Sequence, residues 1–183
     1  MQKEIIVIIG GPGTGKTTLL NGLIALGYCC YPEISRAITV AAKKQGIDQL
    51  FIEKPLLFSE LLLEGRIKQF QEAQSENQDL VFIDRGIPDI VAYLESIEKP
   101  YANLFQTACT KYRYTKIFIL PPWQEIYTCD AERYEDFETA TNIHNHLIAT
   151  YTKNGYSLTE VPKNTPEKRI QFILDAIARD LKE

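Results

Sequence analysis

The sequence predicts an α/β fold with three layers, α/β/α, built around a five-stranded parallel sheet. Short, continuous apolar runs alternate along the chain with longer stretches in which apolar residues recur at helical spacing. The apolar runs contain few polar residues, which is typical of strands that are buried on both faces. Because strands separated by helices form parallel sheets with helices on either side, three layers are the expected result.

The apolar runs place strands at residues 4–10, 28–33, 80–84, 116–120 and 155–161. Helices are expected at 16–27, 34–45, 57–73 and 87–97, in a segment that ends near Lys153, and from Thr165 onward. Gly27 is placed to end the first helix, and Thr165-Pro166-Glu167 has the cap, the proline and the acid of a helix start. No repeat or linker interrupts the pattern, so we expect residues 1–183 to form one domain.

The charge and the cysteine pattern argue against several classes of function. A net charge of −4 and the absence of any Lys/Arg run disfavour nucleic acid as the main ligand. No apolar stretch reaches the roughly 20 residues needed to cross a membrane. The apolar N-terminus contains an acid and leads into a loop, so we interpret it as a strand and not as a signal peptide. The four cysteines form no C-x-x-C pair, which favours free thiols in a cytoplasmic protein.

The segment Gly10–Thr17, GGPGTGKT, matches the motif G-x-x-x-x-G-K-[ST] of P-loop NTPases and stands between a strand and a helix. Its glycines let backbone N–H groups converge on an anion, and the helix start adds positive potential. Lys16 is expected to reach the β- and γ-phosphates, and the Thr17 hydroxyl to bind Mg²⁺. The predicted nucleotide contacts are Gly11, Pro12, Gly13, Thr14, Gly15, Lys16, Thr17 and Thr18. The site is expected to take ATP, and the motif does not exclude GTP.

The run Leu80–Asp84 ends on an acid that is followed by Arg85. A carboxylate at this strand end can hold Mg²⁺; the alternative is an acid that hydrogen-bonds to nearby backbone. Many nucleotide hydrolases carry a glutamate at the next position, where it prepares water for attack. Arg85 has no accessible basic site, so it can only bind phosphate or carboxylate, or form a structural ion pair. The missing acid favours phosphoryl transfer to an acceptor over hydrolysis.

Several segments give the chain a family resemblance: IGGPGTGKTTL, YPEISRAI, FIDRGIPDIVAYL, PPWQEIYTCDAERYEDFETA and YxxxGYSLTEVP. The chain resembles the P-loop domain family that includes the nicotinamide riboside kinase domain of the bacterial NAD regulator NadR. It also resembles nucleoside and nucleotide kinases, in which an acid, an arginine and a small residue follow an apolar strand, as in Asp84-Arg85-Gly86 here. The family that it resembles also contains many proteins described only as predicted ATPases. The resemblance covers most of the chain and implies a sheet arranged as in nucleoside kinases.

The resemblance implies a role for an acid that follows the second strand. In nucleoside kinases an acid at this place contacts the acceptor hydroxyl and can serve as its base, which points to Glu33. The alternative for Glu33 is an acid in the first turn of the next helix, stabilised by the helix dipole. Arg36, one turn later, faces either the same cleft or solvent. Glu33, Arg36 and Arg85 are therefore the predicted acceptor-binding residues.

A charged stretch follows Pro121-Pro122, which cannot extend a central strand. Its position matches the lid of small-molecule kinases, expected here at about residues 121–137, which closes over the phosphates and supplies an arginine. Arg133 is the only arginine in this segment and is therefore the candidate; the alternative is a solvated surface residue. Trp123 either stacks on a base or anchors the lid.

The combined pattern predicts an Mg²⁺–ATP-dependent phosphotransferase that acts on a small, hydroxyl-bearing, nucleoside-like molecule. The predicted catalytic residues are Lys16, Glu33, Asp84 and Arg133, and the predicted metal ligands are Thr17 and Asp84. The alternative is an ATPase or a nucleotide-dependent switch with slow hydrolysis. The aromatic residues Phe51, Phe58 and Tyr93 either line the acceptor pocket or belong to the core. No motif identifies the acceptor or the oligomeric state.

Overall fold

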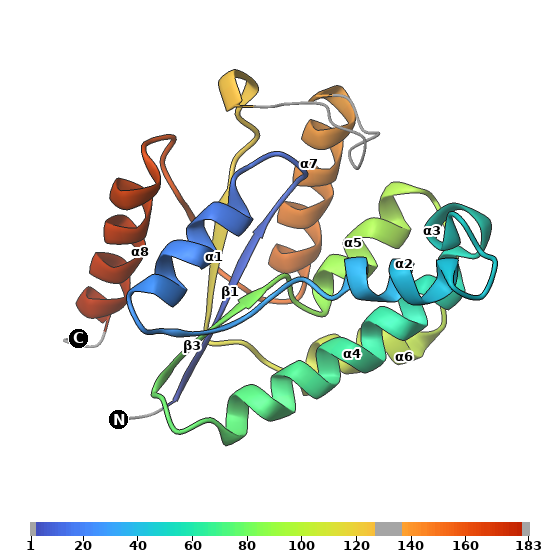
Figure 1. Cartoon of the computed structure of the whole chain (residues 1–183), viewed down its shortest axis with the longest axis horizontal. Coiled ribbons are helices and arrows are strands. Elements are labelled where there is room, and N and C mark those ends of the chain that lie inside the picture. Colours follow the sequence, from blue (N-terminus) through green and yellow to red (C-terminus); the bar gives the residue numbers. More distant parts are fainter. Residues whose placement is uncertain (1–2, 127–136, 181–183) are drawn as a thin grey trace.

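The computed structural model describes residues 3–126 and 137–180 and contains the predicted five-stranded parallel sheet (Figure 1). The strands are β1 (Glu4–Gly10), β2 (Cys29–Tyr31), β3 (Leu80–Asp84), β4 (Lys116–Leu120) and β5 (Leu158–Glu160). Their order across the sheet is β2-β3-β1-β4-β5, and every neighbouring pair is parallel. The α/β fold class is confirmed, although the strands expected at 28–33 and 155–161 are shorter than predicted.

The helices alternate with the strands as the sequence predicts. They are α1 (Lys16–Ala25), α2 (Ser35–Lys43), α3 (Leu50–Glu53), α4 (Pro55–Ser75), α5 (Pro88–Ser96), α6 (Asn103–Lys111), α7 (Phe137–Lys153) and α8 (Pro166–Asp180). A short 3₁₀ turn, η1 (Gln124–Ile126), follows β4. Helices α3 and α6 were not predicted from the sequence. α3 has only four residues, and the buried face of α6 consists of Phe105, Ala108 and Cys109, so neither shows a clear apolar period.

The sheet separates two hydrophobic cores, because successive side chains of a strand point to opposite faces. Ile6 and Ile8 of β1 pack with α1 and α8 on one face, and Ile5, Val7 and Ile9 pack with α4, α5 and α7 on the other. Figure 1 shows α1 and α8 side by side, with the sheet between them and α7. The expected three layers are therefore present.

The strand order brings the two predicted motifs together. β3 lies directly beside β1, with Asp84 in register with Ile8, two residues before the first glycine of the phosphate loop. The phosphate loop and the end of β3 therefore open at the same edge of the sheet, where ligands bind in open α/β folds. β2 borders β3 on its other side, which brings the segment after β2 to the same edge.

The turn that follows β3 is held by buried hydrogen bonds. Asp89 Oδ2 accepts hydrogen bonds from the Gly86 N–H at 2.8 Å and from the Tyr151 hydroxyl of α7 at 2.6 Å. The Tyr114 hydroxyl accepts one from the Ile87 N–H at 3.0 Å. These bonds fix the backbone that presents Asp84 and its neighbour Arg85 to the sheet edge.

Gly86 leaves no room for a side chain in this turn. A Cβ atom there would lie 2.5 Å from the Tyr151 hydroxyl oxygen and 2.8 Å from the Tyr114 ring. We expect Gly86→Ala to lower the free energy of unfolding by about 1–3 kcal/mol, because overpacking forces neighbouring groups apart. Urea denaturation measures the change, and an unaltered midpoint would show that the turn is not constrained in this way.

The predicted lid and its arginine fall partly or wholly outside the described residues. Of the predicted lid, only residues 121–126 and 137 are described, and Arg133 lies outside the described residues.

Among the described helices, none is both long enough and apolar enough to span a membrane.

Candidate functional site

The phosphate loop connects β1 to α1 in the conformation that its glycines permit. Gly13 and Gly15 have φ angles of 71° and 86°, in the left-handed region that other residues rarely adopt. The Thr14 hydroxyl donates to the Gly11 carbonyl at 3.0 Å, which closes the loop on itself. α1 begins at Lys16, directly after the loop, so the loop lies at a helix N-terminus, where an anion is favoured.

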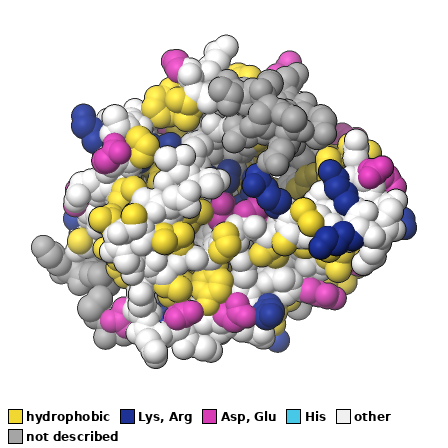
Figure 2. Space-filling model, in the orientation of Figure 1, with side chains coloured by type: hydrophobic (Ala, Val, Ile, Leu, Met, Phe, Trp, Pro, Cys, Tyr) yellow, Lys and Arg dark blue, Asp and Glu magenta, His cyan; other side chains and the backbone are white. Residues whose placement is uncertain are grey.

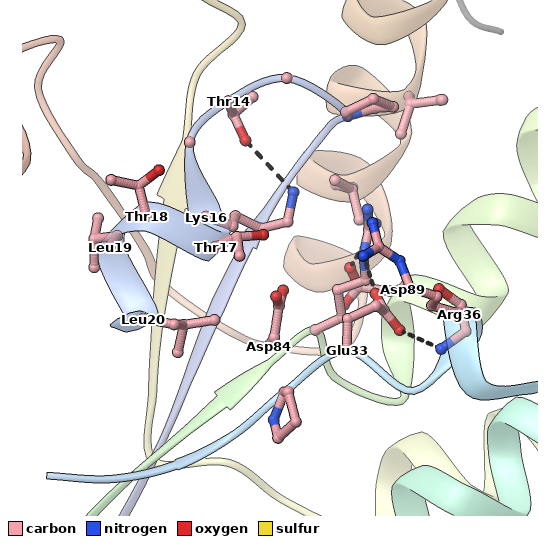
Figure 3. A pocket seen from close by; sticks show the side chains of 18 of the residues that line it. Thr14, Lys16, Thr17, Thr18, Leu19, Leu20, Glu33, Arg36, Asp84 and Asp89 are labelled. Atoms are coloured by element: carbon pink, nitrogen blue, oxygen red, sulfur yellow. Dashed lines mark hydrogen bonds and ion pairs between the residues drawn. The ribbon is translucent and has the colours of Figure 1, made fainter. Parts of the chain in front are cut away.

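Lys16 is buried, and its ammonium group contacts the loop itself. Nζ donates to the carbonyls of Gly10 at 2.8 Å and Gly11 at 2.9 Å. Figure 3 shows its contact with the Thr14 hydroxyl, 3.5 Å away. Burial, together with the nearby positive charge of Arg85, lowers the pKa of Lys16 to about 8, although nearby carboxylates oppose the shift. A phosphate bound to Lys16 in place of the two carbonyls would raise the pKa of Lys16 again, because its negative charge favours the protonated ammonium.

Asp84 points from the end of β3 toward the same region (Figure 3) and is 5% exposed. Its Oδ1 atom has no hydrogen-bond partner among the described residues. Burial raises the pKa of Asp84, and the charges of Lys16 and Arg85 only partly counter this. The Thr17 hydroxyl lies in the same cavity. A carboxylate with an unsatisfied oxygen and a nearby hydroxyl fit the few protein ligands that Mg²⁺ takes beside nucleotide phosphates.

We expect Asp84→Asn to keep the fold and nucleotide binding but to lose the Mg²⁺ dependence of both affinity and turnover. The amide is of similar size but lacks the charge that a divalent cation requires. Calorimetry of ATP binding with and without Mg²⁺ tests this. Asp79→Asn is the matched control, because Asp79 is exposed near the opposite end of β3. An Asp84→Asn protein with normal Mg²⁺ dependence would remove Asp84 from the metal site.

Glu33, two residues beyond β2, is held by two arginines. It forms an ion pair with Arg85, and its Oε1 atom lies 3.5 Å from Arg66 Nη2. The same Oε1 atom accepts a hydrogen bond from the Ser35 N–H at 3.1 Å. Burial alone would raise the pKa of Glu33, but the two positive charges outweigh it and the pKa is lowered. Glu33 thus stabilises the start of α2 and also borders the cleft. Contact with an acceptor hydroxyl stays a prediction.

Arg85 holds an uncommon backbone conformation, with a φ of 69°. Its N–H donates to the Ile8 carbonyl at 3.1 Å, which continues the contact between β1 and β3 beyond the strand end. Its guanidinium lies between Glu33 and Asp89, with 3.8 Å from Nη1 to Asp89 Oδ1. A structural ion pair is therefore present. Contact with a phosphate stays a prediction for the ligand-bound protein.

Arg66 is a site residue that sequence reasoning missed. It lies in α4 and is only 3% exposed. Its Nη1 atom donates to the Gly86 carbonyl at 2.6 Å, so one guanidinium connects the turn after β3 to Glu33. The available signal was a lone arginine between Leu62, Leu63 and Phe70 on a buried helix face.

The site opens into one large cavity of about 1510 Å³. Figure 2 shows acidic and basic side chains gathered in a hollow on this face. The predicted residues Lys16, Glu33, Arg36, Asp84 and Arg85 all line it, together with Arg66 and Asp89. Arg36 therefore faces the cleft, although it is also exposed to solvent. The lining further includes Pro12, Gly13, Thr14, Gly15, Thr17 and Thr18 of the predicted nucleotide site.

The aromatic residues singled out from the sequence pack against other side chains and also line the cavity. Phe58 packs against Phe51, with ring centroids 6.2 Å apart, and against Tyr93, with ring centroids 6.5 Å apart. All three also line the cavity, and contact with an acceptor stays a prediction. Trp123 lies against the Arg169 guanidinium, 5.8 Å from ring centroid to Cζ, and so packs at the edge of the same cavity.

Comparison with known proteins places this geometry in a family. A family model described as "AAA domain" matches residues 5–169. The chain belongs to this AAA domain family. A search of curated proteins finds no match. The family match includes the phosphate loop, the end of β3 and Glu33, and it extends to Arg169 in α8.

Solved structures share the fold of this family member at low sequence identity. A NadR protein in complex with NR has a TM-score of 0.74 and 19% identity, over 97% of this chain and 50% of the NadR chain. A deoxyadenosine kinase from M. mycoides gives 0.69 and 14%, over 96% and 99%. A thymidylate kinase from Ehrlichia chaffeensis gives 0.63 and 16%, over 97% and 100%. The chain thus spans about half the length of the NadR protein and has the P-loop fold of these kinases.

Proposed function

We propose that the protein is an Mg²⁺–ATP-dependent phosphotransferase that acts on a small, hydroxyl-bearing, nucleoside-like molecule. One observation carries the proposal: Glu33 and Arg85 form an ion pair in the wall of the cavity that Lys16 and Asp84 also line. Many hydrolases carry an acid directly after the strand-end aspartate to prepare water, and this chain has Arg85 there. The acid that is present, Glu33, lies toward the cavity wall formed by α2, where a second substrate has room.

In the proposed reaction the acceptor hydroxyl oxygen bonds to the γ-phosphorus. The bond from that phosphorus to the β–γ bridging oxygen breaks, and the nucleoside diphosphate leaves. The hydroxyl proton passes to Glu33. Because two arginines lower its pKa, Glu33 is a weak base. Phosphoryl transfer passes through a loose transition state in which the proton leaves late, so Glu33 first orients the hydroxyl and then takes its proton.

The protein's cations would bind the negative charge of the triphosphate. Lys16 exchanges its loop carbonyls for the β- and γ-phosphates, and Arg85 is near enough to Lys16 to influence its pKa. Thr17 and Asp84 are the residues that would hold Mg²⁺, which neutralises charge on the phosphates. Among the described residues no three His, Cys, Asp or Glu side chains form a metal site, so the phosphates and water would supply the other ligands.

The far end of the cavity suits a planar, partly apolar acceptor. Phe51, Phe58 and Tyr93 line it, and aromatic walls favour flat rings. The named ligands of structurally similar proteins, NR and dCMP, support a nucleoside-like acceptor. Arg36 lines the same cavity and is the further acceptor contact that we propose.

An ADP-release assay against a panel of nucleosides, other ribosides and sugars tests the proposal. We expect slow release without an acceptor and an increase of roughly a hundredfold or more with the right one. The alternative is an ATPase or switch, and Arg85 disfavours it, because an arginine follows Asp84 where many hydrolases carry an acid and a guanidinium cannot take a proton from water. Fast release that no acceptor increases would support that alternative.

A further inference from the structure

Arg169, in α8, is a buried cation that the proposed reaction does not use. It is 4% exposed, and its Nη1 atom donates to the Thr14 carbonyl of the phosphate loop at 3.0 Å. Its Nε and Nη2 atoms are also buried, and neither has a hydrogen-bond partner among the described residues. Burial lowers the pKa of Arg169. Two of the three nitrogens of a buried guanidinium are therefore unsatisfied.

Such an arrangement is unfavourable for the protein alone. A buried charged group normally has all its donors paired, because desolvation is costly and is repaid only by hydrogen bonds or an opposite charge. Buried polar atoms without a partner therefore require an explanation, and a ligand that is absent from the structure is one of the common explanations. A guanidinium has only donors, so the missing group must be an acceptor.

The place of Arg169 points to the ligand. Its guanidinium lies on the phosphate loop, since a Cβ on Gly15 would be 3.0 Å from Nη1. Trp123 covers it from the segment after β4, and both residues line the cavity that contains Lys16. Figure 1 shows α8 alongside α1, the helix that starts at the loop. A nucleotide with its terminal phosphates at Lys16 therefore passes close to Arg169.

We infer that Arg169 binds the donor nucleotide directly, through the pair of donors formed by Nε and Nη2. The inference rests on the proposed nucleotide site. Two parts of a nucleotide present paired acceptors that match such a fork: the oxygens of the α-phosphate, and the O6 and N7 atoms of guanine. Adenine presents N7 beside an amino donor and matches only one of the two. Arg169 thus either adds a phosphate contact or favours guanine nucleotides.

Calorimetry of the Arg169→Lys variant tests the inference with four probes: diphosphate, tripolyphosphate, ATP and GTP. Lysine keeps the charge and one donor for the Thr14 carbonyl but lacks the fork. Diphosphate can occupy only two phosphate positions and so reports whether the loop is intact. Arg179→Lys is the matched control, because Arg179 is exposed on the same helix.

We expect Arg169→Lys to bind diphosphate like the original protein and to lose roughly tenfold or more in affinity for another probe. A loss that includes tripolyphosphate identifies the α-phosphate as the partner, and a loss confined to GTP identifies guanine. Unchanged affinities for all four probes, or an equal loss that includes diphosphate, would overturn the inference, because Arg169 would then only brace the loop. If the unsubstituted protein binds no triphosphate at all, that result refutes the proposed nucleotide site itself, whatever the role of Arg169.

Discussion

Replacing Lys16 with alanine is expected to weaken ATP binding by roughly a hundredfold or more. Hydrogen bonds to charged groups contribute about 1.5–3 kcal/mol each, and Lys16 is expected to make one to each of two phosphates. No other described lysine reaches the loop, because Lys43, the other lysine that lines the cavity, lies at the end of α2. The remaining N–H groups of the loop cannot replace a full positive charge. Calorimetry with Mg²⁺–ATP measures the loss.

Lys43→Ala is the control for this experiment. It removes a cavity-lining lysine of the same length and charge, and we expect ATP affinity to stay within about twofold, since Lys43 is solvent-exposed and its charge is screened. The thermal midpoint of each variant shows whether it is folded, because Lys16 also bonds the Gly10 and Gly11 carbonyls. A folded Lys16→Ala protein with unchanged affinity would refute the assignment of the nucleotide site.

Glu33→Gln is expected to remove most of the acceptor-dependent turnover while ATP affinity changes little. A positioned carboxylate contributes about 10²–10⁴ in rate to proton transfer, and glutamine can still donate or accept a hydrogen bond but takes no proton. The substitution keeps the side chain's size, so the hydrogen bond to the Ser35 N–H can survive. The turnover rate with a saturating acceptor and the ATP dissociation constant are the two quantities to compare.

Glu60→Gln is the matched control, because Glu60 is exposed on α4. Removing the charge of Glu33 leaves Arg66 and Arg85 with less compensation, so the variant's thermal midpoint must be measured as well. Full acceptor stimulation in a folded Glu33→Gln protein would exclude Glu33 from the reaction. A loss of ATP affinity equal to the loss of turnover would place Glu33 at the nucleotide and not at the acceptor.

The sequence predicted the parts of the site that depend on local pattern. The phosphate loop, β1 and β3 could be found because continuous apolar runs lead directly into Gly10 and Asp84. The strand order that brings these two together follows the rules of parallel α/β sheets. The resemblance to kinases added Glu33, which no periodicity would have singled out.

The remaining site residues depend on contacts between distant segments. Arg66 is 33 residues from Glu33 and 20 from Gly86, and it joins them only because tertiary packing brings α4 next to both. The bond from Tyr151 to Asp89 spans 62 residues, and that from Arg169 to Thr14 spans 155. Periodicity and motif spacing carry no information about such pairs, since the two partners lie in segments whose local patterns are independent of each other.

The direct test of the transferase proposal is the fate of the γ-phosphoryl group in water enriched in oxygen-18. The protein, Mg²⁺–ATP and the acceptor found by the panel are incubated, and mass spectrometry determines where the phosphoryl group goes. We predict a phosphorylated acceptor without solvent oxygen, in amounts that match the ADP released, and only a trace of labelled phosphate. Labelled phosphate as the main product, with no phosphorylated acceptor, would contradict it.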